Sequence, residues 1–256
     1  MRRHIFVYPI VNKPQYLSTL PQRAGGIEPC PGLFASQLVY TERFEWSVME
    51  YVTVKKEASD FFIEKKSKFI GFCKPVQSEE EAMAFIAGIK KQHFDASHNV
   101  YAYILREGNI KRFSDDGEPQ GKAGIPVLDV MEKCGVTDAV VVASRYFGGT
   151  LLGGGGLIRA YSHTASIALA AAEKVLMKKC FLMRLSCDYY FYGRVSTLIP
   201  ECGGVIDETL FLEDVTLRFH TLPEEQCAMQ KKLSDLTNGK IMAEVTGEKY
   251  FDFPAE

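Results

Sequence analysis

A glycine-rich turn flanked by arginines is the segment of this sequence best suited to bind an anion. It begins with Arg145-Tyr146-Phe147, has glycine at six of the nine positions from 148 to 156, and is followed by Arg159. A β-branched run precedes it and an Ala-rich helical pattern follows it. Glycine lets a backbone approach a ligand closely, and the N–H groups of a helix N-terminus favour an anion. The pattern predicts a phosphate or nucleic-acid ligand, with tight helix-on-sheet packing as the alternative explanation.

Two established phosphate-binding motifs do not match this turn. No Gly-Lys-Ser or Gly-Lys-Thr is present, so the Walker pattern is missing. The spacing of Gly154 and Gly156 would require a third glycine where Arg159 stands, so the dinucleotide fingerprint fails as well. Nucleotide hydrolysis and hydride transfer are therefore not favoured.

A polar loop over residues 114–124 carries three carboxylates, those of Asp115, Asp116 and Glu118. Carboxylates this close could bind Mg²⁺ or share a proton. Asp-Gly and Glu-Pro are also turn dipeptides, and aspartate caps nearby N–H groups. No matching histidine, cysteine or acidic cluster accompanies them, which favours a structural turn. His98, beside a predicted strand, is a candidate catalytic residue, although a local hydrogen-bonding role is commoner.

Composition limits the classes of function. The chain has 256 residues, enough for one large or two small domains, and a formal net charge of −2. Residues 180–256 carry 7 Lys and Arg against 13 Asp and Glu, so a polyanion would avoid the tail. The seven cysteines include no Cys-x-x-Cys pair, which indicates reduced thiols in a cytoplasmic protein. No zinc spacing or membrane-spanning run is visible, so we expect no cofactor, metal or membrane contact.

Residues 1–48 differ from the rest of the chain. They hold five of the eleven prolines and the only tryptophan, and show no helical or strand period. We expect an irregular extension. If Ser47 has an AGT or AGC codon, the codons of Trp46 and Ser47 together contain GGAG just before the Met49 codon. That sequence would resemble a bacterial ribosome-binding site. We therefore hypothesise that Met49 is the true start, which N-terminal mass spectrometry of the native protein would test.

The middle segment, residues 49–179, predicts one domain. Alternation and β-branched runs predict strands over residues 52–64, 68–73, 99–105, 110–113 and 139–144. The last of these is almost wholly apolar and should lie at the centre of a sheet. Ser78 with Glu81 forms a capping-box pattern at the start of one helix. Further helices are expected over residues 127–133 and 157–173, and a linker near Lys178-Lys179.

The tail, residues 180–256, repeats a smaller pattern. Strands are predicted over residues 181–187, 205–210, 215–219 and 240–247, with helices over residues 191–200 and 223–236. The order β-α-β-β-α-β is that of a ferredoxin-like unit. Such units often bind RNA or other proteins, but the fold alone assigns no function.

Two ordered blocks resemble the Impact family in its bacterial, YigZ-type form. They are Arg112-Phe113-Ser114-Asp115-Asp116-Gly117-Glu118-Pro119 and Arg145-Tyr146-Phe147-Gly148-Gly149, and the resemblance covers about residues 51–175. It implies a first domain like domain 2 of ribosomal protein S5 and a tail similar to the last domain of elongation factor G, within the α+β class. Eukaryotic relatives act in translational control. Lys122 departs from the pattern, since the family commonly has threonine there.

The leading hypothesis is a translation-associated regulatory protein that binds structured RNA or the ribosome without catalysis and without DNA specificity. The expected phosphate contacts are Arg112, Lys122, Arg145, Tyr146, Gly148, Gly149, Gly153, Gly154 and Arg159, beside the motif residues His98, Asp115, Asp116 and Glu118. One alternative is a protein-interaction module in translational control that binds its partner through the tail. Another is a metal-dependent enzyme acting on a phosphate compound.

Overall fold

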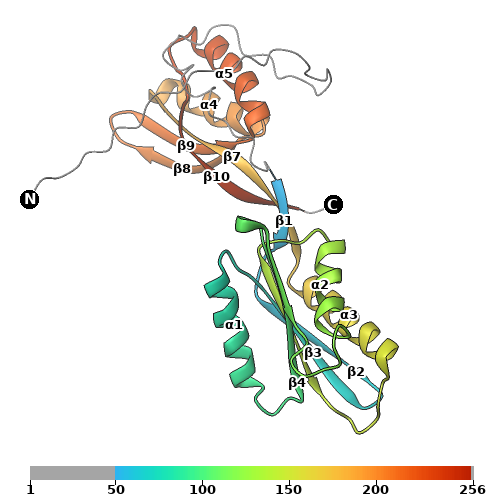
Figure 1. The fold of residues 1–256 in the computed structure, drawn as a ribbon. Helices are drawn as coiled ribbons and strands as arrows, with labels where there is room; N and C mark the ends of the chain where they lie inside the picture. Colours follow the sequence, from blue (N-terminus) through green and yellow to red (C-terminus); the bar gives the residue numbers. More distant parts are fainter. Residues whose placement is uncertain (1–49, 255–256) are drawn as a thin grey trace, which may run out of the picture.

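The computed structural model describes residues 50–254 as two antiparallel β-sheets, each covered by helices (Figure 1). The predicted α+β architecture with two domains is confirmed. The extension predicted for residues 1–48 and the start proposed at Met49 lie outside the described residues.

The first sheet has the strand order β2-β3-β6-β4-β5, and every neighbouring pair is antiparallel. Its strands are β2 (Ala58–Glu64), β3 (Ser67–Pro75), β4 (His98–Leu105), β5 (Ile110–Ser114) and β6 (Ala139–Tyr146). Its helices are α1 (Glu79–Gln92), α2 (Gly124–Lys133) and α3 (Gly154–Ala171). Helix α1 lies on one face, and α2 and α3 lie on the other (Figure 1).

Strand β6 lies at the centre of this sheet because both of its faces are apolar. All of its residues from Ala139 to Arg145 are buried. Val140 and Val142 pack into the core beneath α1, whereas Val141 and Ala143 pack into the core beneath α2 and α3. The prediction of a central strand covered on both faces is confirmed.

Helix α1 begins directly after Ser78, at the position that the capping-box pattern predicts. The Oγ of Ser78 accepts a hydrogen bond from the N–H of Glu81 at 3.2 Å. The Glu81 carboxylate accepts one from the N–H of Gln77 at 2.8 Å, one residue further back than a capping box implies. Both side chains therefore satisfy N–H groups at the helix start, as expected. The buried residues of this helix are Ala82, Ile86 and Ile89.

Helix α3 packs closely on β3 because Gly71 has no side chain. A Cβ atom at Gly71 would lie 2.6 Å from the carbonyl oxygen of Thr164 and 2.9 Å from the Cβ of Ala168. Only small residues allow a helix and a strand to approach so closely. The close packing predicted for the Ala-rich helix is thus confirmed.

The second sheet contains β1 (Glu50–Val54), β7 (Lys174–Cys187), β8 (Val205–Phe211), β9 (Val215–Thr221) and β10 (Glu244–Pro254). Its helices are α4 (Tyr189–Glu201) and α5 (Pro223–Thr237). Strand β7 pairs with β1, β9 and β10, and β9 pairs with β8, always antiparallel. The predicted order β-α-β-β-α-β of the tail is confirmed. Its last strand was predicted from residue 240 but begins at Glu244, because the N–H of Ala243 donates to the side-chain oxygen of Gln230 on α5.

Two boundaries predicted from the sequence are wrong. The single strand predicted over residues 52–64 is two strands in different sheets, because the chain turns at Lys55, whose N–H bonds to the carbonyl of Glu173 at 2.8 Å. The linker predicted near Lys178-Lys179 lies inside β7. That stretch is part of an extended ladder, since β10 pairs with residues 175–184 and β1 with residues 174–178.

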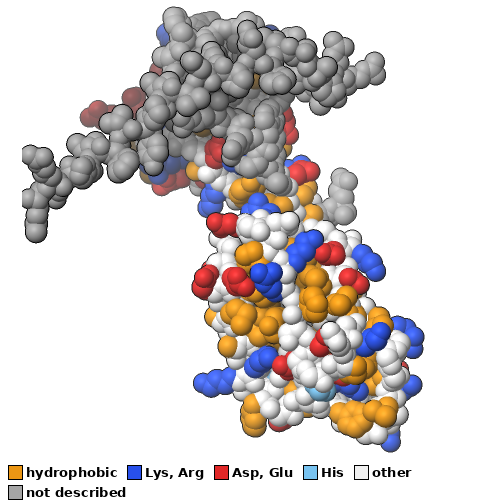
Figure 2. All heavy atoms as spheres, in the orientation of Figure 1, with side chains coloured by type: hydrophobic (Ala, Val, Ile, Leu, Met, Phe, Trp, Pro, Cys, Tyr) orange, Lys and Arg blue, Asp and Glu red, His pale blue; other side chains and the backbone are white. Residues whose placement is uncertain are grey.

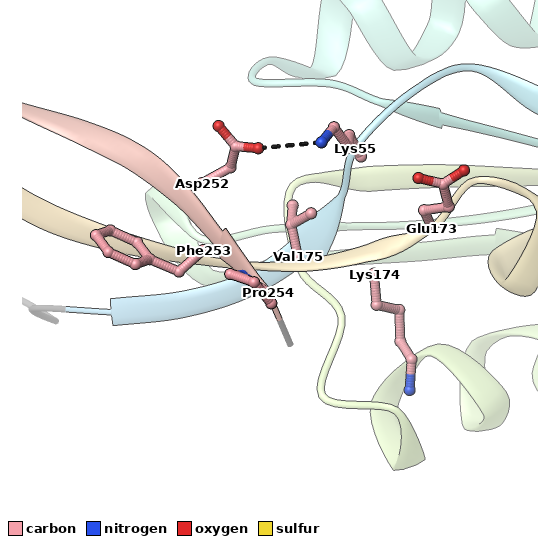
Figure 3. A pocket seen from close by; sticks show the side chains of 7 residues that line it. All are labelled: Lys55, Glu173, Lys174, Val175, Asp252, Phe253 and Pro254. Carbon is pink, nitrogen blue, oxygen red and sulfur yellow. Dashed lines mark ion pairs between the residues drawn. The ribbon is translucent and has the colours of Figure 1, made fainter. Parts of the chain in front are cut away.

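An open cavity of about 490 Å³ lies where this ladder meets the first domain (Figure 3). The side chains of Lys55 and Asp252 form an ion pair of 3.4 Å at its edge. Both are more than half exposed, so the pair adds little to stability. The remaining lining residues are Glu173, Lys174, Val175, Phe253 and Pro254.

Two further expectations concern the environment of the protein. Between residues 50 and 254, none of the helices has the length and apolarity needed to cross a bilayer. Five of the six cysteines in this part of the chain are free thiols, of which Cys73, Cys180 and Cys187 are buried, whereas Cys227 is disulfide-bonded, contrary to the expectation of reduced thiols. Burial raises the pKa of Cys73 to about 12, so this thiol is not a reactive thiolate.

Candidate functional site

The N-terminus of α3 is formed by four consecutive glycines. Gly153 precedes the helix with a φ of +75°, a conformation that L side chains rarely adopt. The first helical turn has no acidic residue, and none of the side chains in the described part of the chain caps it. The glycines therefore leave the positive end of this helix without a side chain above it, as an anion site requires.

Two cations lie beside this helix end. The Cε of Lys122 lies 3.9 Å from the position that a Cβ on Gly154 would take. The Nη1 of Arg159 lies 3.7 Å from the corresponding position on Gly155. Both residues are exposed. The polar loop over residues 114–124 and the glycine turn thus meet at one place, which sequence alone left open.

Arg145 does not take the role that the sequence predicted. It is only 5% exposed, and its Nη1 lies 2.6 Å from the Oε1 of Glu118, which is 8% exposed. Its guanidinium also lies 5.5 Å from the ring centre of Phe69 and 5.4 Å from that of Phe147. Arg145 therefore ties the polar loop to β6, and its charged head is not presented to a phosphate.

Glu118 has a second partner that the sequence did not indicate. The hydroxyl of Tyr161, on α3, donates to the same Oε1 at 2.8 Å. Burial, and then the charge of Glu118, raise the pKa of Tyr161 far above its ordinary value, so this phenol stays protonated and donates. The Nε of Arg145 is buried, and no group within residues 50–254 forms a hydrogen bond with it.

Asp115 caps α2. Its Oδ1 accepts from the N–H groups of Ala123 at 3.1 Å and Gly124 at 2.8 Å. Its Oδ2 accepts from the N–H of Gly121 at 2.8 Å. Every one of these bonds is local, which supports the interpretation of this carboxylate as part of a turn.

Asp116 connects the loop to α1 and β4. Its Oδ1 is 2.6 Å from the Nζ of Lys90, and its Oδ2 accepts from the N–H of Asn99 at 2.6 Å. Partial burial raises the pKa of Asp116, but the hydrogen bonds from Lys90 and Asn99 outweigh it and hold the pKa below its ordinary value. This carboxylate therefore stays ionised.

His98 forms a local hydrogen bond, as the commoner interpretation of its position predicted. Its Nδ1 lies 2.9 Å from the carbonyl oxygen of Asp116, and its Nε2 lies 3.9 Å from the Oε1 of Glu118. Gly117 of the polar loop, whose φ is +87°, packs against the His98 ring, since a Cβ on this glycine would lie 3.4 Å from the Nδ1 atom.

The three carboxylates thus point to separate partners and do not converge on one point. Across residues 50–254, no group of three or more His, Cys, Asp and Glu side chains is arranged to hold a metal ion. The interpretation of residues 114–124 as a metal site of an enzyme therefore loses its geometric support.

Arg112 and Tyr146 lie on the other side of the sheet. Arg112, on the edge strand β5, is paired with Tyr103, which packs in the core beneath α1. Tyr146 is half-buried, and its hydroxyl lies 2.9 Å from the Nδ1 of His93. Neither side chain joins the surface formed by Lys122 and Arg159. Of the pair Tyr146 and Phe147, the latter is the more exposed, at 48%.

Gly148 and Gly149 serve the backbone in different ways. A Cβ on Gly148 would lie 2.0 Å from the carbonyl carbon of Lys66, and its N–H donates to the Oγ of Ser67 at 3.1 Å. Gly148 is therefore required for packing against the β2–β3 turn. Gly149 has open space around it and a φ of +82°.

Three contributors to this region were not predicted as site residues, namely Ser67, Lys90 and Tyr161. Tyr161 lies four positions after Leu157 on the buried face of α3, so helical periodicity could have placed it in the core. Nothing in the sequence pairs Lys90 with Asp116, since 26 positions separate them.

The sequence matches the descriptions of two known domains. Residues 65–169 match the Impact N-terminal domain, and residues 185–240 match a domain of unknown function, DUF1949. Lys122, Arg159 and the glycine turn lie in the first match.

Similar proteins support the same assignment over more of the chain. It is 39% identical over 191 residues to IMPACT family member YvyE of Bacillus subtilis (strain 168), across 74% of this chain and 88% of that protein. It is 32% identical over 180 residues to IMPACT family member YigZ of Escherichia coli (strain K12), across 69% and 88%. A crystal structure described as that of a hypothetical protein matches with a TM-score of 0.50 and 28% identity, across 78% of this chain and 99% of the other. The resemblance seen in the two sequence blocks is thereby confirmed, and the chain belongs to the IMPACT family.

Proposed function

We propose that this protein acts in the cytoplasm in the regulation of translation and binds structured RNA or the ribosome without catalysis. The binding site is the cationic turn, which we define as Lys122, Gly153, Gly154, Gly155, Gly156 and Arg159. One observation carries the proposal, namely that two exposed cations lie beside a helix N-terminus without acidic residues.

This arrangement is electrostatically unfavourable without an anion. A cation near a helix N-terminus opposes the positive end of the helix dipole, at a cost of about 0.3–1 kcal/mol for an exposed group. A phosphate placed between the side chains and the glycine N–H groups is attracted both by the cations and by the positive end of the helix. Phosphate contacts of this kind fix a protein on a nucleic acid without reading its sequence, which fits the expected lack of DNA specificity.

The finer fold assignments belong to the same proposal. The first domain is taken to be like domain 2 of ribosomal protein S5, and the tail like the last domain of elongation factor G. The neighbour order β10-β7-β9-β8 in the tail supports a ferredoxin-like unit. Both assignments are consistent with a role at the ribosome, although fold alone does not establish one.

The test is co-sedimentation of the full chain with ribosomes across a salt series. We expect log affinity to fall linearly with log salt for the wild type, and the slope to shrink by about 1 for each phosphate contact removed. Lys122→Ala and Arg159→Ala should each reduce the slope. Lys232→Ala, an exposed cation on α5 in the acidic domain, is the matched control and should leave the slope unchanged.

Co-sedimentation that is insensitive to salt, or equal slopes for all three variants, would contradict the proposal. Arg145→Ala is not suited to this test, because the buried pair with Glu118 makes its effect on folding inseparable from any effect on binding.

A second candidate, a protein-interaction module acting through the tail, is favoured by one surface. Tyr190 is 76% exposed and Leu212 is 73% exposed, beside Tyr189, whose ring stacks on Phe211 with centroids 6.4 Å apart. Exposed apolar groups in one cluster are typical of protein contacts. Tyr190→Ala should abolish capture of such a partner and leave ribosome co-sedimentation intact. Point substitution is preferable to deleting residues 180–256, since that cut would fall inside β7.

A further inference from the structure

One face of the first sheet is only partly covered. Helix α1 packs against β4 and β6, while α3 covers β2 and β3 from the other side. Phe62 stacks on Phe69 beneath α3, so alternation places Phe61 and Ile63 on the α1 side, where none of the helices between residues 50 and 254 covers them. Phe61 is 55% exposed there, and Ile63 is 65% exposed.

This surface is cationic as well as apolar. Lys68 pairs with Ile63 across the hairpin, and its Nζ lies 4.7 Å from the centre of the Phe61 ring. Lys65 and Lys66 form the exposed turn between β2 and β3. We define the open face as Phe61, Ile63, Lys65, Lys66, Lys68 and Ile70.

The carboxylates near the open face are turned away from it or already engaged. Alternation places Asp60 and Glu64 of β2 on the opposite side of the strand from Phe61. At the two ends of the open face, Asp95 accepts a hydrogen bond from the Tyr146 hydroxyl, and Glu57 forms an ion pair of 2.9 Å with Lys74. The charge of the open face therefore complements an anion.

The open face and the cationic turn lie on opposite sides of the sheet and approach each other at the end of the β2–β3 hairpin. Gly148 packs on the backbone of Lys66 and donates to Ser67, so the β2–β3 turn lies against the glycine turn. Figure 2 shows hydrophobic side chains beside Lys and Arg side chains at this end of the domain, away from the second sheet. A bound polymer that passes around this end of the sheet could contact both surfaces.

We propose that the open face is a stacking platform for a single-stranded segment of RNA whose phosphates continue onto the cationic turn. An exposed aromatic ring beside lysines on a sheet surface suits an unpaired base, which stacks on the ring while its phosphates meet the cations. A duplex hides its base faces and gains only the charge contacts. The choice of RNA rests on the proposed function, whereas the preference for a single strand comes from the exposed ring and the lysines.

The experiment measures binding of the full chain to a fluorescein-labelled oligoadenylate of about ten nucleotides, with a duplex RNA of equal length as competitor. Phe61→Ala should weaken binding of the single strand about tenfold, as loss of one stacked base does, while Phe61→Tyr keeps the ring and should restore it. Lys68→Ala should weaken binding and reduce its salt dependence. Tyr190→Ala, an exposed aromatic in the acidic tail, is the control and should change nothing.

A stacking signature separates this platform from general charge attraction. An oligonucleotide containing 2-aminopurine should change its fluorescence on binding wild type and Phe61→Tyr, but not Phe61→Ala. Equal affinity for single strand and duplex, or wild-type binding by Phe61→Ala, would overturn the proposal. A self-associated wild type that becomes monomeric in Phe61→Ala would overturn it too, because a second copy would then occupy the face.

The two proposals fail separately. If Lys122→Ala and Arg159→Ala reduce the salt slope on ribosomes but Phe61→Ala binds oligoadenylate normally, the open face is refuted and the proposed function stands. If Phe61→Ala loses oligoadenylate binding but the wild type does not co-sediment with ribosomes, the proposed function is the one refuted.

Discussion

A single oxygen atom, the Oε1 of Glu118, joins three elements of the first domain. It contacts Arg145 on β6 and Tyr161 on α3, while Glu118 itself lies in the loop that leads to α2. Because all three side chains are buried, the loop is fixed against the sheet and the helix together. Lys122, four positions further along, is thereby held beside the start of α3.

We expect Arg145→Ala to lower the free energy of unfolding by about 3–5 kcal/mol, because it leaves the Glu118 carboxylate buried without its cation. Urea denaturation of both proteins measures the difference. The double variant Arg145→Met with Glu118→Leu should lose much less, since it removes both charges. An Arg145→Ala protein as stable as the wild type would show that the pair is not a buried support of the loop.

At the level of residues, the sequence predicted an exposed Arg145, whereas this side chain is buried. Arginine before a glycine turn is typical of a phosphate contact, but its direction depends on strand alternation and on what lies opposite. Here alternation turns Arg145 toward the same core as Val141 and Ala143. Its partner Glu118 is 27 positions away in sequence, a pairing that only the fold creates.

The glycine turn shows how one element can hold glycines for different reasons. Gly148 is needed because the backbone of Lys66 fills the space where a Cβ would lie, and Gly149 is needed because its φ is +82°. Steric overlap with backbone requires the chain to move, whereas a left-handed φ costs alanine only about 1–2 kcal/mol.

We expect Gly148→Ala to destabilise the protein more than Gly149→Ala, by more than about 3 kcal/mol against about 1–2 kcal/mol. The two substitutions are matched in chemistry and differ only in surroundings, so thermal or urea unfolding gives a direct comparison. The reverse order would mean that the β2–β3 turn yields easily, and that Gly148 does not hold it against the glycine turn.

Local sequence signals predicted elements well where they act within a few residues. The serine cap of α1 and the apolar strand β6 lie where expected, and the glycine run forms the start of α3, which begins at Gly154, three residues earlier than predicted. Boundaries set by distant contacts were missed. The turn at Lys55 depends on the carbonyl of Glu173, which no local pattern could reveal.

At the scale of the whole molecule, the segment predicted as a linker is a strand of the second sheet. Strand β7 spans residues 174–187. It pairs with β1 over residues 174–178, with β9 over residues 181–187 and with β10 over residues 175–184. The segment predicted as a linker near Lys178 is therefore paired with both β1 and β10.

We expect backbone amides of residues 175–178 to be protected in native-state hydrogen exchange, because β1 and β10 both pair with this stretch. Peptide-resolved mass spectrometry of the full chain would measure it. The exposed segment of residues 212–214, between β8 and β9, is the internal control and should exchange rapidly. Equal exchange in the two segments would restore the linker interpretation.

Patterns within the sequence were enough to predict the α+β class, the order of elements in the tail and the family resemblance. These follow from periodicity, caps and turn residues, which act over short distances along the chain. Only the packed fold shows that Arg145 is buried, that Lys122 and Arg159 share one helix end, and that the helices between residues 50 and 254 leave one face of β2 and β3 uncovered. Each of these depends on which side of a sheet a residue faces and on partners tens of positions away, and such contacts exist only once the sheets and helices have packed.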